Sequence, residues 1–71
     1  AENRLVDLLR RLHDEEVQVH IRTVVIQALT GPYTIVDVGD DYVRVRKENR
    51  KRPIDLIFNL VNIERVEICR D

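Results

Sequence analysis

The sequence predicts a mainly β fold, in which one N-terminal α-helix precedes a five-stranded, strongly bent antiparallel barrel. Three observations indicate this architecture. Leucines recur at helical spacing near the N-terminus, and short stretches further on alternate between apolar and polar residues. Glycine, proline or asparagine separates several of these stretches. The 71 residues are enough for one small domain, which we expect to span residues 1–71.

The predicted helix runs from Asn3 to Glu15. Its apolar stripe consists of Leu5, Leu8, Leu9 and Leu12, with Val6 beside it. Asn3 suits the N-cap position, because its side-chain oxygen can accept a hydrogen bond from a backbone N–H of the first turn. A helix this short is marginal in water, so we expect the stripe to pack against the rest of the domain.

Five strands are expected after the helix, forming a barrel over residues 17–69. They are Val17–Thr23, Tyr33–Val38, Asp41–Lys47, Ile54–Val61 and Ile63–Cys69. The first alternates between apolar and polar residues, as a half-buried strand does. Between the first two strands, Gly31 and Pro32 interrupt the pattern. Glycine there permits a strong bend or a close backbone approach, and proline suits an edge or a bulge.

The segment from Gly31 to Val45 is the most informative part of the chain. Apolar residues alternate on both sides of the tripeptide Gly39–Asp41, and Tyr42 follows it. Glycine suits a positive φ angle, and aspartate side chains bond to nearby backbone, so this tripeptide predicts a tight turn. A turn that presents two acids and an aromatic ring is either a recognition loop or a plain hairpin turn.

Charge is unevenly distributed, although the 12 Lys and Arg residues nearly balance the 13 Asp and Glu residues. Acids dominate Asp14–Glu16. The basic segment consists of Arg44, Arg46, Lys47, Arg50, Lys51 and Arg52. Such a segment could hold the phosphates of a nucleic acid, above all if several copies of the chain gather. The plainer interpretation is a solvated loop whose charges protect an apolar strand from aggregation.

The sequence offers little for catalysis or metal binding. Serine is absent, and Cys69 has no histidine near it in the sequence. His13 and His20 lack the spacing of zinc ligands. We therefore expect no enzymatic activity, no cofactor and no metal. Because there is one cysteine, no signal peptide and no apolar run long enough to cross a membrane, we expect a soluble cytoplasmic protein without a membrane partner.

The stretch from Ile54 to Val61 is apolar on both faces. One face carries Ile54, Leu56, Phe58 and Leu60, and the other carries Ile57 and Val61. A strand of this kind is covered on both sides or contributes to an interface.

The order of these elements resembles the Sm-like superfamily (SH3-like barrels), which includes Hfq. The residues that match its first motif are Gly31, Tyr33, Val36, Asp40, Tyr42, Val43 and Val45. Asp37 has the usual spacing from the glycine and is the alternative loop acid; Asp40 is preferred because Tyr42 then takes the aromatic position. Asn62 and Ile63 match the end of the second motif.

The resemblance implies a cyclic homo-oligomer, in which the fourth strand of one subunit pairs with the fifth strand of the next. The expected subunit interface consists of Ile54, Leu56, Ile57, Phe58, Val61, Val66 and Ile68. The resemblance also implies that the ring binds single-stranded RNA in its pore, as an RNA chaperone or riboregulator. The expected pore residues are Asp40, Asp41, Tyr42, Asn59 and Asn62, and the basic segment would contact phosphates.

This sequence departs from the family pattern at the second loop. Asn59 and Leu60 stand in place of Arg-Gly in one alignment, and Leu60 and Val61 stand in place of Lys-His in the other. In the family those residues help to hold RNA. The alternative hypothesis is therefore a structural or protein-interaction ring that has lost RNA binding.

Overall fold

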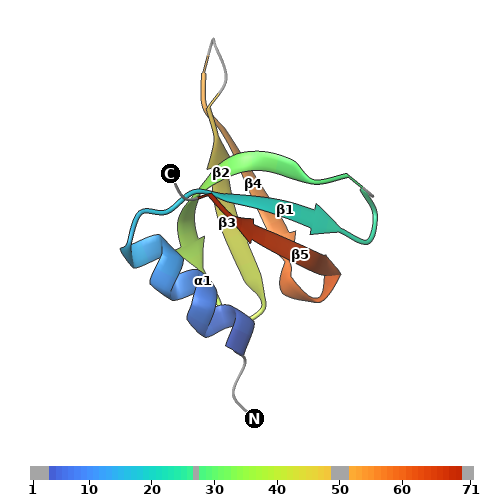
Figure 1. Ribbon diagram of the computed structural model, residues 1–71, viewed down its shortest axis with the longest axis horizontal. Helices are drawn as coiled ribbons and strands as arrows, with labels where there is room; N and C mark the ends of the chain where they lie inside the picture. Colours follow the sequence, from blue (N-terminus) through green and yellow to red (C-terminus); the bar gives the residue numbers. More distant parts are fainter. Residues whose placement is uncertain (1–3, 27, 49–51, 70–71) are drawn as a thin grey trace.

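The computed structural model describes residues 4–26, 28–48 and 52–69. Its elements are α1 (Arg4–Asp14), β1 (Val19–Thr23), β2 (Thr30–Val38), β3 (Tyr42–Lys47), β4 (Ile54–Asn59), the 3-10 helix η1 (Leu60–Asn62) and β5 (Ile63–Ile68). The prediction of a mainly β fold, with one helix followed by five antiparallel strands, is confirmed (Figure 1). The predicted N-cap, Asn3, lies outside the described residues.

The five strands form one sheet in the order β4-β3-β2-β1-β5. The strands do not close into a barrel, because within the described residues β4 and β5 lie at opposite edges of the sheet and do not pair with each other. The short helix η1 carries the chain between these edges. Its Leu60 N–H donates to the Asp41 carbonyl at 2.9 Å, and its Asn62 carbonyl accepts from Val24 N–H at 2.9 Å. The crossing places β5 beside β1 and leaves the sheet open.

The pairing of β1 with β2 requires glycine at position 31. Gly31 has a φ of 129°, and a Cβ there would lie 2.9 Å from the carbonyl oxygen of Val19. The register shifts at this point, between Val19 and Ile21. The predicted close approach is therefore confirmed. It lies inside a strand, however, because β2 begins at Thr30 and not at Tyr33.

Helix α1 ends in two backbone hydrogen bonds of the Schellman type. Glu16 N–H donates to the His13 carbonyl at 3.1 Å, and Val17 N–H donates to the Leu12 carbonyl at 3.0 Å. Glu16 takes the left-handed conformation that this ending requires, with a φ of 57°. The reversal directs the chain into β1 and lets Val17 pack against the core.

The core lies between α1 and one face of the sheet, with α1 packed mainly against β2 (Figure 1). Its buried residues are Val6, Leu9, Leu12, Val19, Ile21, Tyr33, Ile35, Val43, Val45 and Leu60. The alternation predicted for the strands is confirmed by these residues. The helical stripe is only partly confirmed, because Val6 is buried while Leu8 is exposed.

The structure changes the expected end of the fourth strand. Leu56 and Phe58 pack against the core, and Ile57 points outward with 69% of its surface exposed. The strand ends at Asn59, and the 3-10 turn then buries Leu60 and leaves Val61 81% exposed. The prediction that the strand continues to Val61 is therefore wrong, because the chain turns there to cross the sheet.

We predict that Gly31→Ala lowers the free energy of unfolding by about 1–3 kcal/mol, because it forces a side chain into a left-handed backbone conformation against a neighbouring carbonyl. Urea unfolding followed by circular dichroism measures this. Thr34→Ala is the control, since it places the same side chain at an exposed position of the same strand where the backbone is not left-handed. Equal losses for the two variants would contradict the prediction.

Candidate nucleic-acid interface

Two reversals of the chain meet at one end of the β3–β4 hairpin. Tyr42 pairs with Asn59 across the two strands. Gly39 N–H donates to the Tyr42 carbonyl at 2.9 Å and closes the β2–β3 turn, while the Asp41 carbonyl accepts from Leu60 N–H at 2.9 Å. We call the group of Asp40, Asp41, Tyr42 and Asn59 the corner. The structure thus brings together four of the five predicted pore residues. Asn62 lies at the far end of η1, beside Val24.

The ring of Tyr42 is held in place at the corner. It lies so close over Gly39 that a Cβ there would overlap it, which explains the glycine. Gly39 does not have the positive φ that the sequence suggested; it provides room for the ring. The Tyr42 hydroxyl donates a hydrogen bond to Asp37 Oδ2 at 3.0 Å. This bond to a carboxylate raises the pKa of Tyr42. Asp37, the alternative loop acid, therefore anchors the aromatic ring.

The other polar side chains of the corner have local partners. Asn59 Oδ1 accepts from the backbone N–H of Val61 at 3.3 Å, so Asn59 caps the 3-10 helix. Asp40 accepts from Arg10 of α1 at 3.4 Å, an exposed pair of the kind that contributes little to stability. Asn59 therefore has a structural role at the point where β4 ends and the 3-10 helix begins.

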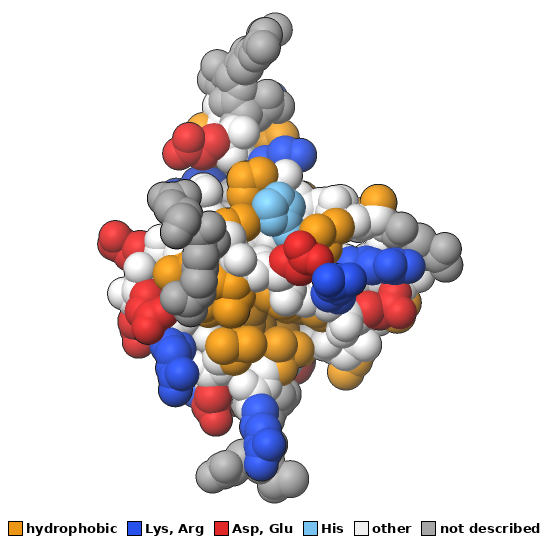
Figure 2. All heavy atoms as spheres, in the orientation of Figure 1, with side chains coloured by type: hydrophobic (Ala, Val, Ile, Leu, Met, Phe, Trp, Pro, Cys, Tyr) orange, Lys and Arg blue, Asp and Glu red, His pale blue; other side chains and the backbone are white. Residues whose placement is uncertain are grey.

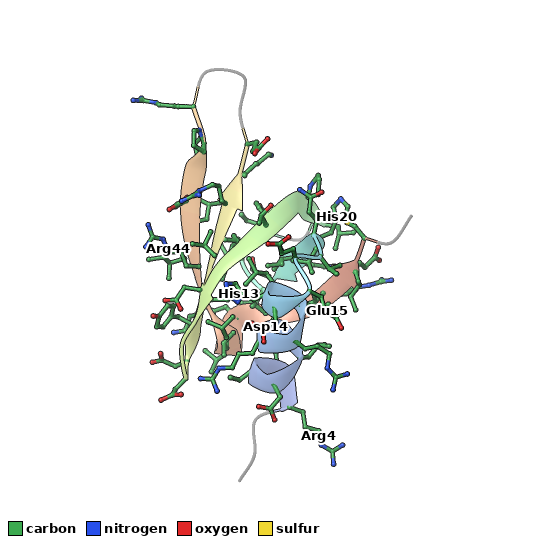
Figure 3. The ribbon with its side chains drawn as sticks, turned by 90° about the vertical axis from the view of Figure 1, so that its left-hand side faces the viewer. Arg4, His13, Asp14, Glu15, His20 and Arg44 are labelled. Carbon is green, nitrogen blue, oxygen red and sulfur yellow. The ribbon has the colours of Figure 1, made fainter. Side chains whose placement is uncertain are left out.

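The arginines of β3 are bound to an acid that the sequence analysis did not single out. Asp55 lies directly opposite Arg46 on β4. Its carboxylate accepts from Arg44 at 2.7 and 3.1 Å and from Arg46 at 2.7 and 3.3 Å. Arg44 lies on the outer side of the hairpin, away from α1 (Figure 3). One acid thus compensates half of the positive charge of this pair.

These contacts change how the carboxyl and one guanidinium titrate. Hydrogen bonds from Arg46 and Arg44 lower the pKa of Asp55 from 3.8 to about 2. The bond to Asp55 raises the pKa of Arg46. The carboxylate therefore stays ionised through any neutral or mildly acidic solution.

Two residues of the basic segment, Lys47 and Arg52, lie at the opposite end of the hairpin from the corner. Tyr42 begins β3 and Lys47 ends it, which separates them by about 16 Å at strand spacing. Lys47 and Arg52 are exposed, and the ends of β3 and β4 next to them extend beyond the other strands of the sheet (Figure 1). Arg50 and Lys51 lie outside the described residues. The aromatic ring at the corner and the cations at the hairpin end are therefore two separate features and do not form one continuous site.

The residues expected at the subunit interface fall into two groups. Leu56, Phe58, Val66 and Ile68 are partly buried and pack against the core of their own chain. Ile54, Ile57 and Val61 are exposed. Figure 2 also shows hydrophobic side chains gathered between α1 and β5, where the open sheet leaves its interior partly uncovered.

Sequence reasoning missed a contact between Cys69 and His20. Cys69 Sγ lies 3.1 Å from His20 Nδ1, although 49 positions separate the two residues. The pairing of β1 with β5 brings them together. Both strands were predicted from the sequence, but nothing in the sequence indicated that they pair.

The other histidine lies at the C-terminal end of α1. His13 Nδ1 is 3.3 Å from Asp14 Oδ1 (Figure 3). The two residues line an open hollow together with Glu16, Thr34 and Ile35. Within the described residues, no group of three or more histidine, cysteine, aspartate or glutamate side chains is arranged to hold a metal ion.

No family model, curated protein or solved structure matches this chain. Over the described residues, no helix is long and apolar enough to cross a membrane.

We predict that Asp55→Asn lowers stability near neutral pH but not in strong acid. The pKa of Asp55 is lower in the folded chain than its ordinary value of 3.8. Its ionised form therefore stabilises the fold above that value, and this stabilisation is lost as the pH falls toward about 2. Urea midpoints of the wild type and Asp55→Asn, measured between pH of about 5 and about 2, should converge at the acid end. A constant difference between the midpoints would disprove the arginine–aspartate contact.

Proposed function

We propose that this protein is an Sm-like, ring-forming protein that binds single-stranded RNA, in the role of an RNA chaperone or riboregulator. The observation that carries this proposal is the corner. There, two chain reversals meet beside a tyrosine whose ring is anchored by Gly39 and Asp37, in a sheet whose two edge strands could pair with other copies.

Self-assembly follows from the edges of the sheet. Edge strands present backbone donors and acceptors that pair readily with another strand, unless charge or bulk prevents this. The edge strand β4 carries the exposed apolar side chains of Ile54 and Ile57, and Val61 follows it. Pairing of β4 in one copy with β5 in the next would satisfy both edges, and a closed ring leaves no edge free.

RNA binding follows from the corner and the hairpin end. A base that stacks on an aromatic side chain typically gains about 1–3 kcal/mol. Tyr42 suits this role because Gly39 and Asp37 already fix its ring, so little side-chain freedom remains to be lost. In a ring, each copy would add one tyrosine to the same face. Lys47 and Arg52 would attract phosphates, while Arg44 and Arg46 retain one net positive charge beside Asp55.

A second candidate function is a structural or protein-interaction ring without RNA binding. Three features of the second loop favour it. The Asn59 side chain is engaged as a helix cap, Leu60 is buried in the core, and Val61 presents an apolar surface. Leu60 and Val61 offer no polar side-chain atom to a nucleotide, and because the Asn59 oxygen already accepts from Val61 N–H, only the Asn59 amide N–H₂ group remains as a donor.

For assembly, we predict that Ile57→Asp reduces the oligomer to a monomer without unfolding it. A charge on an edge strand opposes pairing with another strand, and an exposed position contributes little to the core. Light scattering coupled to size exclusion gives the mass, and circular dichroism reports the fold. Thr34→Asp, on the exposed side of the central strand β2, is the matched control and should leave the mass unchanged. A monomeric wild type, or an Ile57→Asp oligomer of unchanged mass, would exclude this mode of assembly.

For RNA binding, we predict that Tyr42→Leu weakens affinity about tenfold, because it removes the stacking surface. Tyr42→Phe keeps the ring and should retain most of the affinity. Fluorescence anisotropy with short uridine-rich and adenine-rich RNAs at low salt measures this, and affinity should fall steeply as salt is added. If the wild-type oligomer binds neither RNA at micromolar protein, the proposal of RNA binding fails and the structural ring is favoured.

A further inference from the structure

Cys69 and His20 form a pair of side chains that neither the proposed assembly nor the proposed RNA site uses. The Sγ–Nδ1 distance of 3.1 Å is a hydrogen-bond distance. Two elements fix the pair: His20 lies within β1, and the Cys69 N–H donates to the Gln18 carbonyl at 2.9 Å and continues the β1–β5 ladder. The contact between the two side chains therefore depends on the backbone pairing of β1 with the residues at the end of β5.

The pair lies on the outer face of the sheet. Val19 and Ile21, the neighbours of His20 along β1, point into the core, so His20 points outward. Both His20 and Cys69 are partly exposed, which leaves the sulfur within reach of a small molecule. Figure 3 shows His20 and His13 on different elements, so the other histidine of the chain does not belong to this group.

Charged side chains of both signs surround the pair. Glu67 lies directly opposite His20 in the ladder, and Arg65 lies opposite Arg22. Arg65 and Glu67 form an ion pair at 2.6 Å. The surroundings are polar, and a charged intermediate there would remain partly solvated.

We propose that Cys69 is a reactive thiol assisted by His20, and that it forms mixed disulfides with small, low-molecular-weight disulfides. The nucleophile in such exchange is the thiolate, and a histidine within hydrogen-bond distance can take the thiol proton as the sulfur attacks. The spatial pairing of a nucleophile with a base is the feature that defines this site; a cysteine alone would not.

The reaction is thiol–disulfide exchange, with the small disulfide as the only co-reactant. Cys69 Sγ forms a bond to one sulfur of the disulfide while its proton passes to His20 Nδ1. The bond between the two sulfurs of the reagent breaks, and the second sulfur leaves with the electron pair as a thiolate. That thiolate takes up the proton from His20 or from water. Cys69 is oxidised to a mixed disulfide, and one small thiol is released.

The rate of reaction with an aromatic disulfide, dithiobis(nitrobenzoate), tests the proposal through the coloured thiol that it releases. At neutral pH, His20→Gln should react about tenfold more slowly than the wild type, because glutamine cannot accept the proton. His13→Gln is the matched control and should react at the wild-type rate. Cys69→Ser should release no coloured thiol. Oxidised glutathione, followed by intact-protein mass, should give one adduct on the wild type and none on Cys69→Ser.

A reaction of His20→Gln at the wild-type rate would overturn the role of the histidine. A second measurement needs no variant: the folded wild type should react faster than the same chain unfolded in urea, after correction for the effect of urea on a free thiol. Only the folded chain brings His20 to the sulfur. Slower reaction of the folded protein would mean that folding protects the thiol, and the proposal would be wrong.

Discussion

The strand β2 holds the two parts of the sheet together, and the close approach at Gly31 makes this possible. The first residues of β2 pair with β1, and its later residues pair with β3. At Gly31 the backbone of β2 comes so near to Val19 that a side chain has no room. Tyr33 and Ile35 follow on the same strand and enter the core, where the ring of Tyr33 meets that of Phe58 edge-on. The placement of β3, β4 and the corner therefore depends on this one backbone contact.

The path of the chain after β4 decides what the molecule can assemble into. A hairpin between β4 and β5 would have produced a sheet with different edges. Instead, Leu60 turns into the core, and η1 crosses to β1. The two strands that are neighbours in sequence thereby become the two edges of the sheet. In this arrangement one copy carries two open edges, and a second copy is the simplest partner for them.

Charge on the β3–β4 hairpin is organised by local pairing and not by net composition. The sequence presents a run of basic residues, but Asp55 on the facing strand binds two of them. The cations that stay available for a polyanion lie at the hairpin end, about 16 Å along β3 from the tyrosine of the corner. A nucleic acid that used both features would have to run along the hairpin. The three acids nearest the tyrosine, Asp37, Asp40 and Asp41, would oppose a phosphate at the corner itself.

Local pattern was enough to determine most of the secondary structure of this protein. Alternation at Val19 and Ile21, and at Val43 and Val45, reports burial on one face, because side chains on a strand alternate between its two sides. The break at Gly31 was likewise visible, since few residues other than glycine tolerate such a conformation.

Tertiary structure decided which strands pair, and therefore every contact between distant residues. The alternation of apolar residues does not indicate the order of strands in the sheet, because it shows only that one face of each strand is buried. For this reason the pairing of Asp55 with Arg44 and Arg46, and the contact of Cys69 with His20, could not be predicted. The same holds for Gly39, whose role depends on a ring that folds back over it. The side-chain pairs discussed above form between residues of separate strands, and only the folded chain brings those residues together.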